Sequence, residues 1–140
     1  MSRERIIIVG GGISGLAIAG FLANHISNTP FVAFNVVVWG SIGFSAFIDN
    51  VPYLTAMIPV VQLMSDSLGI NVQLLVFGLL IGASLGGNIT PIGAAANIVA
   101  MGTLKKHDVH VSFLDFVKIG LPFTIVATAL GALFIYLVWG

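Results

Sequence analysis

The chain has 140 residues, of which 58% are hydrophobic and 7% are charged, and its formal net charge at pH 7 is zero. A soluble domain carries about 25% charged residues, and the mean hydropathy of this chain is +1.11. The composition therefore predicts an all-α integral membrane protein in a lipid bilayer, and it excludes a basic surface for nucleic acid. The absence of cysteine excludes disulfides and thiolate metal sites.

The first apolar run, residues 6–24, contains a G-x-G-x-x-G pattern formed by Gly10, Gly12 and Gly15. This pattern resembles the amino terminus of FAD-dependent oxidoreductases. The motif also needs an acidic residue about 20 residues further on to hold the ribose, and residues 31–39 contain no Asp or Glu. We therefore expect a Gly-rich membrane helix without a cofactor. FAD binding is the alternative, and a join between two unrelated coding segments is a third origin for this pattern.

The second apolar run, residues 31–48, ends at Asp49-Asn50, and a third run, residues 51–64, follows at once. An ionisable group within the membrane costs about 2.5–3.5 kcal/mol on insertion scales, so Asp49 is a candidate functional residue. Pro52 disfavours helical backbone in the residue before it, which predicts a chain reversal. We expect a re-entrant hairpin with Asp49 and Asn50 at its tip, because the second limb of about 14 residues is too short to cross. The alternative is a loop between two full spans, with Asp49 in solvent.

The next apolar run, residues 74–101, is interrupted near its middle by glycines, asparagines, a threonine and Pro91. Non-helical backbone at membrane depth is tolerated only where protein or a watery cavity satisfies its polar groups. Discontinuous helices of this kind form the ion and substrate sites of secondary transporters. The pattern therefore predicts a broken helix at a binding site, and the alternative is a kinked packing helix.

The last span is expected from Ile119 to Trp139, with Pro122 in its first turn, where the missing N–H of proline does no harm. The polar connection before it contains His107 and His110. Solvation is a more common state than metal binding for such a pair, and no metal site is predicted.

Basic residues cluster at two places, at Arg3 and Arg5 and again at Lys105, Lys106 and Lys118. The positive-inside rule places both clusters in the cytoplasm, and the topology closes only if the hairpin is re-entrant. We therefore predict a multi-pass protein of the cell membrane whose amino terminus and 103–118 loop are cytoplasmic.

Two motifs carry a family resemblance, SAFIDNVPYLTAMIPV at residues 45–60 and GASLGGNITPIGAAANIV at residues 82–99. They resemble the carboxy-terminal repeat of the ion transporter superfamily, in particular its arsenite-pump and sodium/proton-antiporter branch and, more distantly, citrate carriers. The resemblance covers about residues 31–140. It implies half of an inverted-repeat transporter, with about three to four transmembrane helices, one re-entrant hairpin and one discontinuous helix.

The resemblance also implies an ion or substrate site between the hairpin tip and the helix break. Its expected ligands are Asp49, Asn50, Gly87, Asn88, Thr90 and Asn97, and its expected structural residues are Pro52, Gly86, Pro91 and Gly93. Carboxylate, amide, hydroxyl and carbonyl oxygens form a hard-ligand set suited to Na⁺ or a proton. Helix N-termini at the break would favour an anion.

The chain departs from the family in holding one repeat, since residues 1–30 are a Gly-rich segment and residues 31–140 form the transporter-like domain. A complementary repeat or a second copy of the chain is therefore expected as a partner. The predicted function is that of a fragment of a secondary transporter for a small inorganic ion or small anion, of the arsenite-efflux or sodium/proton-antiport type, rather than an enzyme. The alternatives are a fragment of a membrane-bound flavin oxidoreductase and an inactive membrane remnant.

Overall fold

The computed structural model describes residues 29–140, so the predictions for Gly10, Gly12 and Gly15 lie outside the described residues. This part of the chain forms five α-helices and no strands, which confirms the all-α prediction for these residues. The helices are α3 (Pro30–Ser45), α4 (Asn50–Leu68), α5 (Val72–Gly86), α6 (Ala95–Lys106) and α7 (Phe113–Trp139).

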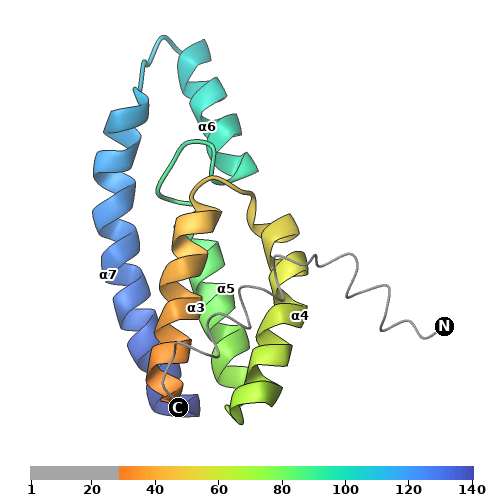
Figure 1. Ribbon diagram of the computed structural model, residues 1–140. Coiled ribbons are helices and arrows are strands. Elements are labelled where there is room, and N and C mark those ends of the chain that lie inside the picture. The colour runs from red at the N-terminus through yellow and green to blue at the C-terminus, as the bar shows by residue number, and fades with distance from the viewer. Residues whose placement is uncertain (1–28) are drawn as a thin grey trace, which may run out of the picture.

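Helix α5 lies at the centre of the bundle and packs against α3, α4 and α7. Figure 1 shows α3, α4 and α5 together in the lower part of the molecule, with α6 beyond their upper ends and α7 running along the full height. No residue of α6 is buried. The packed core of the described chain is therefore made by four of its helices, and α6 extends from it.

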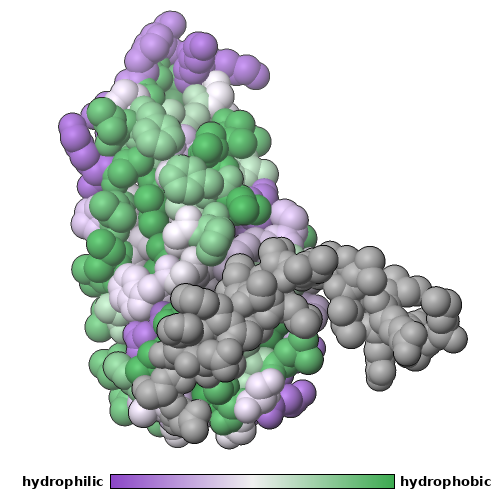
Figure 2. All heavy atoms as spheres, viewed as in Figure 1, coloured by the Kyte–Doolittle hydropathy of each residue, from purple (hydrophilic) through white to green (hydrophobic). Residues whose placement is uncertain are grey.

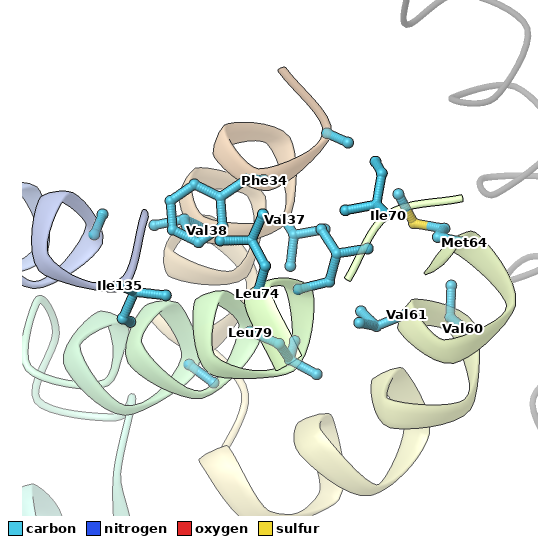
Figure 3. Close-up of a cluster of buried hydrophobic side chains, with 14 of the residues drawn as sticks. Phe34, Val37, Val38, Val60, Val61, Met64, Ile70, Leu74, Leu79 and Ile135 are labelled. Atoms are coloured by element: carbon cyan, nitrogen blue, oxygen red, sulfur yellow. The ribbon is translucent and has the colours of Figure 1, made fainter. Parts of the chain in front are cut away.

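The core is a cluster of aliphatic and aromatic side chains around α5 (Figure 3). Leu74, Leu75 and Leu79 of α5 are almost completely buried and contact side chains from the neighbouring helices. Those neighbours include Phe34 and Val38 of α3, Val61 and Met64 of α4, and Ala132 and Ile135 of α7. Because α5 is covered by three helices, its hydrophobic residues need not lie on a single face.

The outer surface is also strongly apolar (Figure 2). Nine large hydrophobic residues of α7 are more than half exposed, namely Leu114, Ile119, Phe123, Val126, Leu130, Leu133, Phe134, Leu137 and Val138. Apolar patches of this extent are rare on soluble monomers. The 27 residues of α7 span roughly 40 Å at about 1.5 Å per residue, against a hydrocarbon core of about 30 Å.

Among residues 29–140, α7 is the one helix that is both long and apolar enough to cross a membrane, and α3 and α5 are shorter apolar helices. The sequence predicted three to four transmembrane helices, and the structure supports one of them, α7. The others, and the re-entrant placement of the hairpin, stay predictions.

Helices α3 and α5 approach closely along three glycines of α5, Gly78, Gly82 and Gly86. A Cβ atom on Gly82 would collide with the backbone carbonyl of Val38. A Cβ atom on Gly86 would lie 2.8 Å from the Cα and carbonyl oxygen of Ile42. Small residues spaced four apart let membrane helices bring their backbones together. Gly86, expected as a structural residue, therefore lies where only glycine fits without movement of α3.

The hairpin prediction is confirmed in part, because residues 46–49 join α3 to α4 in a helical hairpin with Asp49 as the N-cap of α4. The second limb is longer than expected, since α4 has 19 residues and ends at Leu68. Gly69, with φ of 64°, terminates it in the left-handed conformation that glycine adopts readily. The added residues, 65–68, are mostly polar, and α4 is not among the helices of residues 29–140 that are both long and apolar enough to cross a membrane. The re-entrant placement therefore stays a prediction.

The break in the next apolar run is confirmed. Helix α5 ends at Gly86, α6 begins at Ala95, and residues 87–94 are non-helical. The alternative of one continuous kinked helix is wrong.

The predicted start of the last span is also wrong, because α7 begins at Phe113 and Pro122 lies inside it. The cause is a capping box, in which the Ser112 hydroxyl accepts from the Asp115 backbone N–H at 3.2 Å while the Asp115 carboxylate accepts from the Ser112 N–H at 3.3 Å. Such a pair satisfies helix N–H groups that have no partner within the helix. The helix therefore starts at the polar residues, ahead of the apolar run.

We expect Gly82→Ala to lower the free energy of unfolding by about 1–3 kcal/mol, the typical cost of inserting atoms into a packed interface. Gly40→Ala on α3 is the matched control, because a Cβ atom there meets nothing within 4 Å, and alanine favours helix over glycine by about 1 kcal/mol. Denaturant unfolding in detergent micelles, followed by circular dichroism, measures both. Equal stability of the two variants would contradict the close backbone contact.

Candidate functional site

Two turns from distant parts of the chain meet at one place, which we call the turn junction and define as residues 45–50 together with residues 86–97. The buried Thr90 hydroxyl donates a hydrogen bond to the carbonyl of Ala46 across the junction. A Cβ atom on Gly93 would lie 2.9 Å from the same carbonyl oxygen and 2.7 Å from that of Gly87. The hairpin tip and the helix break are therefore in direct contact, as the family resemblance implied.

Asn97 closes the non-helical segment from the first turns of α6. Its Nδ2 donates to the carbonyl of Gly87 at 2.8 Å and to that of Thr90 at 3.0 Å. Both amide hydrogens of Asn97 are therefore used within the fold, and its Oδ1 is left as the group that can accept from another molecule.

Asp49 lies between the N-termini of two helices and is half-buried. Its Oδ1 accepts from the N–H of Val51 in α4 at 3.4 Å, and its Oδ2 accepts from the N–H of Ala95 in α6 at 3.3 Å. Helix N-termini carry a partial positive charge that stabilises a carboxylate. Both hydrogen bonds are long, and the single ion pair among residues 29–140 joins Lys118 to Asp115. Asp49 is therefore an anionic group held by backbone rather than by a cationic side chain.

Asn50 contacts Ser45, a residue that was not among the expected ligands. Ser45 Oγ lies 2.6 Å from Asn50 Oδ1 and 2.5 Å from the carbonyl oxygen of Ala83 in α5. A hydroxyl has one hydrogen, so both contacts are satisfied when the Asn50 amide is turned to present Nδ2 to Ser45 Oγ. Asn50 also lies against Gly87, where a Cβ atom would come within 3.0 Å of its Oδ1.

Helix α7 covers one side of the junction through Gly120 and Thr124. Thr124 Oγ1 donates to the carbonyl of Leu85 at 3.2 Å, and a Cβ atom on Gly120 would collide with the carbonyl of Asn88. Sequence reasoning missed both residues. The signal was the row of small residues at four-residue spacing, Gly120, Thr124 and Thr128, which is typical of a helix packed closely in a membrane. At about 1.5 Å per residue, Gly120 and Thr124 lie roughly 10–17 Å along α7 from its first residue. The turn junction therefore lies beside the interior of α7 and not beside its end.

The remaining expected residues have different surroundings. The Asn88 side chain makes no hydrogen bond to any residue in 29–140, while its carbonyl faces α7. Pro91 is buried within the second turn. Pro52 is exposed in the first turn of α4, where proline removes no helical hydrogen bond.

Within residues 29–140, no group of three or more His, Cys, Asp or Glu side chains is arranged to hold a metal ion. His107 and His110 are both exposed in the connection between α6 and α7.

A hairpin tip that meets a broken helix within the length of a membrane-crossing helix is the arrangement by which secondary transporters form their sites. The chain belongs to the citrate transporter family, whose family model matches residues 33–139. It is therefore a membrane protein of a transporter family. The arsenite-pump and sodium/proton-antiporter branch stays a prediction.

Relatives from animals and bacteria support this assignment. The chain is 40% identical to the human P protein over 98 aligned residues. These residues make up 69% of this chain and 12% of the P protein. It is 33% identical over 118 residues to an uncharacterized transporter of Mycobacterium tuberculosis, covering 82% of this chain and 28% of that protein. It is 34% identical over 95 residues to the 46 kDa membrane protein of Mycobacterium leprae. The alignment covers 66% of this chain and 22% of that protein.

The chain thus spans between 12% and 28% of the length of these relatives. No solved structure matches it.

We expect Thr90→Val to lower the free energy of unfolding by about 1–3 kcal/mol, because it leaves the Ala46 carbonyl without its hydroxyl donor. Hydrogen–deuterium exchange should rise in residues 46–49 and 87–94. Thr103→Val is the control, since that exposed hydroxyl bonds only to Val99 in its own helix, and surface changes fall within about 0.5 kcal/mol. Unchanged exchange in the two turns would contradict the role of Thr90 in joining them.

Proposed function

We propose that this chain supplies one half of the translocation site of a secondary transporter for a small charged solute. The turn junction is that half, and Asp49 is the group that exchanges a cation. The observation that carries the proposal is the position of Asp49, a carboxylate between two helix N-termini at the contact of the hairpin tip and the broken helix. Membership of the citrate transporter family supports the transport class.

The hydrogen bonds of the junction favour two classes of residue. Thr90 and Asn97 use their donors to hold the two turns together. Asp49 has long bonds and unshared oxygen lone pairs, and the Asn88 side chain has no hydrogen-bond partner in the described part of the chain. We therefore assign ligand binding mainly to Asp49, Asn88 and the Oδ1 of Asn97, and a supporting role to Asn50, Gly87 and Thr90.

A cation suits this half of the site better than an anion while Asp49 is ionised. An incoming anion would compete with the Asp49 carboxylate for the N–H of Ala95 at the start of α6. Na⁺ or a proton instead finds oxygen ligands of the type it prefers. Neutralising Asp49 would weaken its hold on the α6 N-terminus and make that N-terminus available to an anionic substrate. This links cation binding to the movement of an anion.

The transported solute is proposed at the level of class. The resemblance of residues 45–60 and 82–99 points to arsenite efflux or sodium/proton antiport, and the family description adds citrate as the type of small organic anion. In all three proposals a small ion moves together with, or in exchange for, a cation. A single carboxylate at the junction can bind that cation in every one of them.

A partner supplies the other half of the site, either a complementary repeat or a second copy of this chain. Two observations support this. The chain matches a minor part of its relatives' length, and α6, directly beside the junction, has no buried residue. In the proposed orientation the amino terminus and residues 103–118 are cytoplasmic, which is supported by Lys105, Lys106 and Lys118 at one end of α6 and α7.

Within residues 29–140, no observation favours the flavin oxidoreductase alternative, which depends on Gly10, Gly12 and Gly15. Flavin absorbance in the purified chain would support it.

We expect Asp49→Asn to reduce cation-dependent flux to background in membrane vesicles from cells that express this chain with a complementary family repeat. Asparagine is as good an N-cap as aspartate, so the free energy of unfolding should change little. Asp49→Ala separates the two roles, since it removes the cap and costs about 0.5–2 kcal/mol of stability.

Asp66→Asn is the matched control, because that carboxylate is exposed in the last turn of α4, away from the junction, and its flux should equal that of the unmodified chain. Unchanged flux in Asp49→Asn would remove the proposed role of Asp49. Absence of flux from the unmodified chain, alone and with the repeat, would favour the inactive remnant.

A further inference from the structure

A cavity of about 510 Å³ lies between the end of α6 and the start of α7, apart from the turn junction. Met101, Gly102 and Lys105 line it from α6, and Val109, His110 and Val111 line it from the connection. Ser112 and Asp115 complete it at the beginning of α7. Volumes of about 300–1,000 Å³ are typical of small-molecule sites.

The lining combines apolar walls with a cationic rim. Met101, Val109 and Val111 provide the walls. Asp115 is already engaged, since its carboxylate accepts from the Ser112 hydroxyl at 2.6 Å and pairs with Lys118 at 3.8 Å. Lys105 has no carboxylate within 4.0 Å among residues 29–140. Among the charged residues of the lining, Lys105 is therefore the one without an oppositely charged partner in the described part of the chain.

The cavity lies at the polar end of an otherwise apolar molecule. In Figure 2 hydrophilic residues gather at the top of the molecule, where Figure 1 shows the connection between α6 and α7, and the surface below is mostly hydrophobic. Leu104, Phe113 and Leu114 beside the cavity are exposed. A phospholipid presents a matching order of groups, because its phosphate lies outermost, level with the lysine, and its acyl chains lie below, level with the exposed apolar side chains.

We propose that this cavity binds an anionic phospholipid, with its phosphate at Lys105 and His110 and the first part of an acyl chain along Met101, Val109 and Val111. Basic pockets at the ends of transmembrane helices recognise anionic headgroups by the same chemistry. The N-terminus of α7 does not contribute, because Ser112 and Asp115 cap it. The proposal depends on the chain being in a membrane and is independent of transport through the turn junction.

Native mass spectrometry of the full chain released from detergent tests the charge requirement. With phosphatidylglycerol and phosphatidylcholine of identical acyl chains present, the chain should retain one phosphatidylglycerol in preference to phosphatidylcholine. Lys105→Gln should lower that retention about fivefold, the effect of one lysine at an anionic lipid surface. Lys106→Gln is the control, since Lys106 carries the same charge on the next residue and does not line the cavity.

A second variant tests the cavity without altering charge. Gly102 lines the cavity, and a Cβ atom there meets nothing within 4 Å, so Gly102→Leu fills the space without disturbing the helix. Gly43→Leu on α3 is the control at an equally open glycine away from the cavity. We expect Gly102→Leu to lose the bound lipid and Gly43→Leu to keep it, with helicity by circular dichroism unchanged in both.

Three outcomes would overturn the proposal. Equal losses in Lys105→Gln and Lys106→Gln would indicate diffuse charge attraction, and retention by Gly102→Leu would place the lipid elsewhere. Displacement of the lipid by inorganic phosphate alone would show that the site is for free phosphate.

Discussion

The contact between two interrupted stretches of backbone is the constraint on which the rest of this structure depends. Residues 46–49 and 87–94 leave the helical conformation, and in lipid no water is present to satisfy the N–H and C=O groups that this exposes. Thr90 and Asn97 donate to three of those carbonyls, and Asp49 accepts from two backbone N–H groups. The two breaks therefore satisfy part of each other's backbone, because each supplies hydrogen-bond partners to the other.

Close helix packing makes that contact possible. The glycines of α5 bring its backbone against α3, so the end of α5 at Gly86 lies beside the end of α3. Gly120 of α7 admits the carbonyl of Asn88 in the same way. A side chain at any of these positions would move the turns apart. These glycines thus decide whether the polar groups of the turn junction come into contact.

The polar residues of the junction also differ in what they leave for a ligand. A residue whose donors are all bonded internally, such as Asn97 through its Nδ2, keeps the turns in place. A residue with long or absent internal bonds, such as Asp49 or Asn88, keeps capacity for a solute. Under the proposed function, groups that hold the turns together and groups left free for a ligand therefore lie within the same short motifs.

The sequence by itself determined the membrane class, the helical hairpin at Asp49 and the break after Gly86, because hydrophobic runs, proline, glycine and a lone carboxylate are local signals. The meeting of the hairpin and the break was implied only by the family resemblance of residues 45–60 and 82–99. It misplaced the ends of α4 and α7, where Gly69 and the Ser112 capping box override the limits of the apolar runs. Ser45, Gly120 and Thr124 emerged only from the tertiary structure. Their roles depend on which helix faces them. The four-residue spacing of Gly120 and Thr124 indicates a closely packed face of α7, but it does not say which distant segment packs there.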